Sequence, residues 1–219
     1  FPEVPKGSSR DARRLCKWNG TDAVGAEVDQ KTGVNLKVSR RLKARIIRNR
    51  ARKRKMIYVI TSAQNATRVH PRAWQSLMTY VKHNRAQLLV IPYRYKNPTS
   101  MWSRAAQADD WWDEDTRPYL ITHRVDINKH LVLMADIMTQ PTASEPLLGF
   151  ETITQAKSGI IGHPKLEMLT IATPQASLAK IITTTGSITK KNYIPAKAGK
   201  KAELHHTFGA TVVEGDGNR

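Results

Sequence analysis

The sequence predicts an α/β fold: a βαβ start, extended by a β-rich mixed sheet and preceded by a basic arm that is helical or flexible. Three observations predict it. Two strand-like apolar runs flank one segment of helical periodicity, short apolar runs separated by turn signals fill the second half, and the first quarter of the chain is polar and basic. We therefore expect a polar and basic N-terminal arm over residues 1–55 and an α/β domain over 56–219.

The arm ends in the run RRLKARIIRNRARKRK, residues 40–55, in which ten of sixteen residues are Lys or Arg and none is acidic. Ser39 can cap a helix there, and Leu42, Ile46 and Ile47 fall on one helical stripe. Such a helix would dock on a core through that stripe and present its arginines to solvent.

The βαβ start follows directly. KMIYVITSA (55–63) and AQLLVIPYRY (86–95) are typical of buried strands, and HPRAWQSLMTYVKHN (70–84) has apolar residues at helical spacing with Pro71 in its first turn. Strand, helix and strand in so short a stretch predict a parallel pair with a right-handed crossover.

The rest of the chain is expected to be loop and strand. Residues 96–118 are acidic and Trp-rich, which favours a loop with short helix, and no long amphipathic helix is expected after Asn84. Six short β-like runs then predict the mixed or antiparallel layer: 119–127, 130–138, 147–154, 165–173, 179–189 and 203–214.

Charge and composition narrow the function. The net charge is +18, and residues 1–55 hold seventeen Lys/Arg against five Asp/Glu. Such a concentration attracts nucleic acid or another polyanion. The single cysteine excludes an internal disulfide framework and a CxxC zinc site. No apolar run reaches the ~18 residues of a membrane-spanning helix and no signal peptide is visible, so no membrane insertion is expected.

Two cationic clusters are expected to contact phosphates, which adds affinity without reading sequence. The first consists of Arg45, Arg48, Arg50, Arg52, Lys53 and Arg54, and the second of Lys190, Lys191, Lys200 and Lys201. The alternatives for the first cluster are a solvated helix, a tether or a localisation tag. The alternative for the second cluster is a Thr-rich hairpin with a solvated lysine face. Trp102, Trp111 and Trp112 either stack on single strands or belong to the core.

Two polar segments have open interpretations. The loop 61–71 follows the first strand, where ligands sit in parallel sheets, and it is either a binding site or a capped polar loop. Its donors and acceptors are Ser62, Gln64, Asn65, Thr67 and His70. The acidic residues of segment 109–115 either serve acid/base or two-metal chemistry or dock on the basic arm and compete there with nucleic acid. They are Asp109, Asp110, Asp113, Glu114 and Asp115.

The sequence indicates catalytic residues less strongly than it indicates the cationic clusters. His163, His205 and His206, with Asp136, could serve a metal-dependent phosphodiesterase or nuclease. None of the seven histidines shows HExxH, HxH or GDxH spacing, so no metal ligand is assigned.

Several separated stretches carry a resemblance: ITSAQNAT, IPYRYKNPTS, DDWW, GFETIT, KSGIIGHPKLE, TTTGSIT and HHTFGA. Together they resemble the N-terminal region of tailed-phage and prophage proteins in which a calcineurin-like metallophosphoesterase domain follows. The resemblance implies a phage protein that acts on nucleic acid in the cytoplasm of the infected bacterial host. The sequence has no DxH or GNH motif and only one GD, at Gly215-Asp216, so that domain and its Mn²⁺ or Mg²⁺ would lie outside this chain, in which no cofactor is expected.

The leading hypothesis is therefore a phage nucleic-acid-binding domain, accessory to a metallophosphoesterase or nuclease domain and binding DNA in preference to RNA. The alternatives are a metal-dependent phosphodiesterase or nuclease with its site in this chain, and a structural, oligomeric virion-associated protein. A homo-oligomer is compatible with all three.

Overall fold

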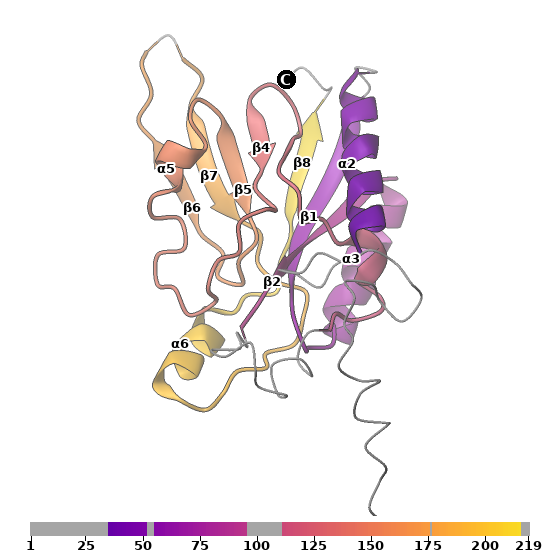
Figure 1. The fold of residues 1–219 in the computed structure, drawn as a ribbon, viewed down its shortest axis with the longest axis vertical. Coiled ribbons are helices and arrows are strands. Elements are labelled where there is room, and N and C mark those ends of the chain that lie inside the picture. Colours follow the sequence, from indigo (N-terminus) through magenta and orange to yellow (C-terminus); the bar gives the residue numbers. More distant parts are fainter. Residues whose placement is uncertain (1–34, 52–54, 96–110, 176, 216–219) are drawn as a thin grey trace, which may run out of the picture.

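The fold was obtained as a computed structural model, which describes residues 35–51, 55–95, 111–175 and 177–215. Two mixed β-sheets pack on each other, and helices lie along the outside (Figure 1). The strand orders are β2-β1-β8 and β3-β4-β5-β7-β6. The α/β class predicted from the sequence is confirmed.

The bounds of the elements follow the chain order. The strands are β1 (Met56–Gln64), β2 (Gln87–Tyr93), β3 (Val125–Asp126), β4 (Leu131–Leu133), β5 (Ser158–Ile161), β6 (Met168–Ile171), β7 (Lys180–Thr184) and β8 (Thr211–Gly215). The helices are α2 (Leu36–Ala51), α3 (Pro71–His83), the 3₁₀ turn η1 (Arg117–Tyr119), α5 (Phe150–Ile153) and α6 (Lys197–His205).

The βαβ start is confirmed. β1 and β2 pair in parallel with Tyr58 opposite Gln87, and α3 connects them. His70 caps α3, because its Nδ1 accepts the backbone N–H of Ala73 at 3.3 Å. β8 adds an antiparallel strand on the other side of β1.

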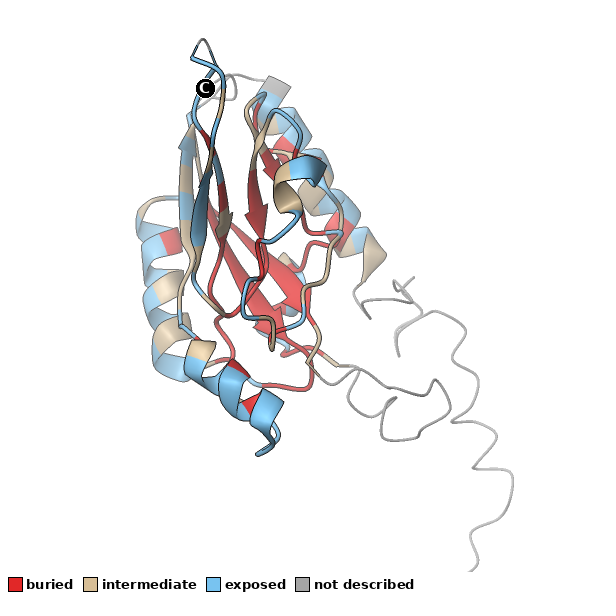
Figure 2. Cartoon of the chain, turned by 90° about the vertical axis from the view of Figure 1, so that its left-hand side faces the viewer, coloured by how far each residue is buried: buried red, intermediate tan, exposed pale blue. Residues whose placement is uncertain are grey.

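Successive side chains along β1 and β2 point to opposite faces of this sheet, so the core lies on both of its faces. Tyr58 and Ile60 point toward the second sheet and pack with Leu133 and Ile160. Residues of the opposite parity pack under the apolar stripe of α3. Figure 2 shows the buried residues in the central strands, with exposed residues along the helices.

The two sheets come very close at one point. A Cβ placed on Gly162, the residue after β5, would lie 2.5 Å from Cγ2 of Ile91 and 3.5 Å from Cβ of Ser62. A side chain here would have to displace β2, so the absence of a Cβ lets the end of β5 rest on the first sheet.

The second half differs from the expectation in its details. The mixed pairing is as predicted. Strand β8 extends the first sheet, whereas β3 to β7 form a separate sheet packed on the first. The run 147–154 contains helix α5 instead of a strand, and residues 203–205 end helix α6. Strand β5 was missed, because its buried run of four residues is too short to show a period.

A buried lysine binds the backbone at the C-terminal end of the helix within 147–154. Nζ of Lys180 donates to the backbone oxygens of Glu151, at 2.5 Å, and of Gln155. A cation at the C-terminal end of a helix satisfies carbonyls that lack intrahelical partners. The two residues are 29 positions apart in the sequence, so no local sequence pattern indicates this contact.

Candidate nucleic-acid interface

The basic helix α2 docks on the sheets through one narrow stripe. Ile46 is fully buried and Leu42 packs on the same cluster, which also holds Tyr58 and Ile60. Ile47 was expected on this stripe but is 47% exposed. Consecutive residues of a helix are about 100° apart, so Ile46 and Ile47 cannot both face the core.

Ser39 does not cap α2 as expected. The helix begins earlier, at Leu36, and Oδ1 of Asn35 accepts the N–H groups of Lys37 and Val38 at 3.0 and 3.2 Å. Ser39 is instead buried within the helix, where its Oγ accepts the N–H of Thr122 at 3.0 Å and lies 2.6 Å from Nδ1 of His123. The docking stripe therefore has a polar anchor as well as an apolar one.

The docked helix presents a cationic face to solvent. Lys37, Arg41 and Arg48 follow one another at helical spacing on the side opposite Ser39 and Ile46, and Arg45 lies on its flank; all four are exposed. Within the described residues, no carboxylate lies within the 4.0 Å limit of an ion pair from these four side chains. Both views place α2 on the outside of the molecule (Figures 1 and 2).

The C-terminal end of α2 forms an ion pair with another part of the chain. Nη1 of Arg50 lies 3.7 Å from Oδ2 of Asp126, and both side chains are partly exposed. Arg50 is thus partly neutralised by a carboxylate of the described residues, and Arg45 and Arg48 have no such partner there. Arg52, Lys53 and Arg54 lie outside the described residues.

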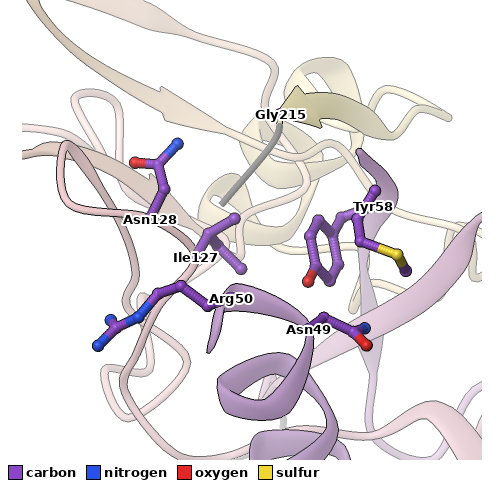
Figure 3. A pocket seen from close by; sticks show the side chains of 7 residues that line it. Asn49, Arg50, Tyr58, Ile127, Asn128 and Gly215 are labelled. Carbon is purple, nitrogen blue, oxygen red and sulfur yellow. The ribbon is translucent and has the colours of Figure 1, made fainter. Parts of the chain in front are cut away.

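The last turn of α2 covers a cavity of about 10 Å³, lined in part by Asn49, Arg50, Tyr58 and Asn128 (Figure 3). A space of this size admits no more than a water molecule. Burial raises the pKa of Tyr58, against the opposing effects of a hydrogen bond from Asn49 and the charge of Arg45. The cavity is a packing gap under the helix and not a ligand site.

The polar residues of loop 61–71 bind the chain itself. Oγ of Ser62 donates to Gly186 O at 2.6 Å, and Nε2 of Gln64 donates to Asn192 O at 2.9 Å. Thr67 is buried and donates to Asn65 O at 3.0 Å. Together with the cap formed by His70, these contacts favour the capped polar loop over a ligand site made of these five residues.

His206, a catalytic candidate, lies in a closed hydrogen-bond network. The hydroxyl of Tyr193 is 2.6 Å from Nδ1, and Nε2 is 3.0 Å from Thr189 O, which accepts. Because a carbonyl can only accept, Nε2 carries the proton and the tyrosine hydroxyl donates to Nδ1. Burial lowers the pKa of His206 to about 4. The ring is a neutral structural group in this arrangement.

The other catalytic candidates do not converge on a metal centre. Nε2 of His163 lies 3.1 Å from Gln140 O and its Nδ1 accepts the N–H of Lys165 at 3.0 Å, so both ring nitrogens are used, and burial lowers its pKa. Asp136 is exposed and pairs with Arg124 at 3.2 Å. His205 ends α6. Among the described residues, no group of three His, Cys, Asp or Glu side chains is placed to hold a metal.

The second cationic cluster is split between a loop and a helix. Lys190 and Lys191 flank an open hollow next to Arg68 and Trp111, whereas Lys200 and Lys201 are exposed on α6. The sequence did not indicate Arg68, because only the fold places it beside Lys190 and Lys191.

Asp113, one residue of the acidic segment, is placed differently from the expectation. Asp113 is buried, and its carboxylate lies 3.8 Å from Nη1 of Arg68 and accepts the N–H of Val69 at 3.1 Å. It therefore docks on the loop before α3 and not on α2. Asp109 and Asp110 lie outside the described residues. Trp112 belongs to the core, Trp111 is half-buried, and Trp102 is not described.

Comparison with known proteins gives one relation. No model of a known protein family and no solved structure matches the chain. The chain is related to a phage protein. It is 35% identical over 163 residues to Protein A1 of Escherichia phage T5, and the match covers 73% of this chain and 29% of that protein. The chain thus spans less than a third of the length of this relative, and the match carries no evidence on a metallophosphoesterase domain.

None of the helices of the described residues is both long and apolar enough to cross a bilayer.

Proposed function

We propose that the chain is the nucleic-acid-binding part of a phage protein and that α2 is its main contact with the sugar–phosphate backbone. One observation carries the proposal. The burial of Ser39 and Ile46 fixes the helix on the sheets, and this leaves Arg41, Arg45 and Arg48 exposed without a carboxylate partner among the described residues.

A fixed helix suits this task better than a tether. Each cation of a flexible arm loses conformational entropy when it meets a phosphate, whereas the backbone of a docked helix is already ordered. Arginine also offers two parallel N–H donors to a phosphate. Backbone contacts of this kind do not read sequence, so we expect weak sequence preference and a strong dependence on salt.

The proposal includes the setting of the domain. The chain would hold DNA, in preference to RNA, for a metallophosphoesterase or nuclease domain elsewhere in a longer protein, in the cytoplasm of the infected host. The relation to a much longer phage protein supports this arrangement. A metal-dependent site within the chain receives no support from the positions of His163, His206 and Asp136.

The test is a binding measurement with a labelled DNA duplex. The variant Arg41→Gln/Arg45→Gln/Arg48→Gln removes three charges from α2, and Arg72→Gln/Lys82→Gln/Arg85→Gln removes three exposed charges from and just after α3. We expect the α2 variant to lose at least tenfold in affinity and the control variant to lose much less. Equal losses would show that only net charge matters and would refute a specific role of α2.

A further inference from the structure

An open hollow lies beside Lys190 and Lys191. The proposed contacts of α2 with the sugar–phosphate backbone do not involve this hollow. It measures about 450 Å³, within the usual range of small-molecule sites. Its lining comes from three distant parts of the chain: Ala66, Thr67, Arg68, Trp111, Lys190, Lys191 and Asn192.

Hydrogen bonds join these three segments into a fixed frame. Ala66 donates its N–H to Trp111 O at 2.9 Å, and Lys190 donates its N–H to Arg68 O at 2.9 Å. Nδ2 of Asn192 donates to Ala66 O at 3.1 Å and to Oγ1 of Thr67 at 3.2 Å. The positions of the cations and of the indole are therefore set by the fold.

One wall of the hollow is planar. The guanidinium carbon of Arg68 lies 5.4 Å from the centre of the Trp111 ring, and the Arg68 side chain is 65% exposed. Nucleic-acid bases stack both on aromatic rings and on guanidinium planes. The guanidinium of Arg68, which lies over the indole of Trp111, thus offers a stacking surface that remains accessible to solvent.

The other wall is cationic. Lys190 and Lys191 are exposed, and no carboxylate of the described residues lies within the 4.0 Å ion-pair limit of either ammonium group. Asp113 is the buried acid next to the hollow, and its carboxylate is taken up by Arg68, Val69 N–H and Asp115 N–H. The two lysines are therefore left to meet an anion.

A planar stacking surface next to two open ammonium groups matches the chemistry of one nucleotide unit. We propose that this hollow binds an unpaired nucleotide, with the base on the Arg68–Trp111 wall and the phosphate on Lys190 and Lys191. The inference rests on the proposed function only in assigning nucleic acid as the ligand, because it uses no residue of α2. It adds a preference for single-stranded regions, since a base within a duplex is already stacked and cannot enter.

The experiment uses the full chain with a labelled single-stranded oligonucleotide, the same sequence as a blunt duplex, and a nucleoside monophosphate. The variants are Trp111→Ala, Trp111→Phe and Lys190→Gln/Lys191→Gln. We expect Trp111→Ala to weaken single-strand binding about tenfold, and Trp111→Phe, which retains an aromatic ring, to weaken it much less. The lysine variant should weaken binding and reduce the salt slope by about 0.7 for each phosphate that the lysines no longer neutralise.

The three ligands and the variants distinguish the possible outcomes. Binding of the monophosphate as tightly as the oligonucleotide identifies a free nucleotide as the ligand, and tighter binding of the oligonucleotide identifies a strand. Single-strand affinity that is the same in wild type and all three variants overturns the inference, as does an equal loss on the duplex. Since the α2 variants are tested on the duplex, a failure of either proposal is visible without the other.

Discussion

Thr122 donates its backbone N–H to Oγ of Ser39 over 3.0 Å, and this bond links α2 to a segment 83 residues further along the chain. Both groups are buried. A buried N–H that loses its acceptor keeps the full cost of its desolvation. The bond therefore fixes the position of the helix and, with it, the direction in which the arginines point.

The first prediction concerns this anchor. Ser39→Ala should lower the free energy of unfolding by about 1–3 kcal/mol, because the N–H of Thr122 is left without its acceptor. Urea denaturation measures the change. Ser76→Ala, at an exposed position of α3, makes the same change in helix propensity and should have little effect. Equal stability changes in the two variants would mean that the hydrogen bond of Ser39 contributes nothing.

The second prediction compares neighbours on α2. Ile46→Ala should cost about 2–5 kcal/mol in unfolding free energy, because a fully buried side chain leaves a cavity. Ile47→Ala should change stability by less than about 0.5 kcal/mol, since that side chain is 47% exposed. Similar losses for the two residues would contradict the docking geometry of α2.

The third prediction is a pH dependence of stability from His206. Its pKa in the folded chain is about 4, below the ordinary 6.5, so the unfolded chain binds a proton that the folded chain does not. Stability is complete above pH about 6.5 and falls as the pH drops toward 4. At pH about 5 the loss from this group is about 2 kcal/mol.

The variant His206→Gln isolates this effect. Glutamine can still donate to Thr189 O and accept from Tyr193, but it does not titrate. We expect urea midpoints of wild type to fall more steeply between pH about 7 and about 5 than those of the variant, while the exposed His83→Gln behaves like wild type. Parallel pH profiles for wild type and His206→Gln would show that His206 is accessible to protons in the folded chain.

Helices and strands could be predicted where the sequence pattern that specifies them lies within the element itself. The β-branched and aromatic residues at the start of β1, the nearly continuous apolar run of β2 and the helical spacing of apolar residues in α3 could be recognised without knowledge of the rest of the chain. The basic helix was predictable for the same reason. Its start was not, because Asn35 and Ser39 are both good capping residues and only the burial of Ser39 distinguishes them.

The candidate hollow was not predictable as a unit. Lys190 and Lys191 stood out by composition, and Trp111 by its type, but Arg68 joins them only through the backbone bonds from Ala66 to Trp111 and from Lys190 to Arg68. Likewise, the histidines suggested a catalytic role, and only the positions of Tyr193 and Gln140 show that the rings of His206 and His163 make contacts within the chain.

The salt dependence of duplex binding tests most directly whether the exposed face of α2 contacts phosphates. The logarithm of the association constant of wild type should fall steeply with the logarithm of the salt concentration, and the slope for Arg41→Gln/Arg45→Gln/Arg48→Gln should be shallower by about 0.9 for each phosphate that α2 no longer neutralises. A slope that is the same in wild type and this variant would contradict the account, because α2 would then release no counterions from DNA.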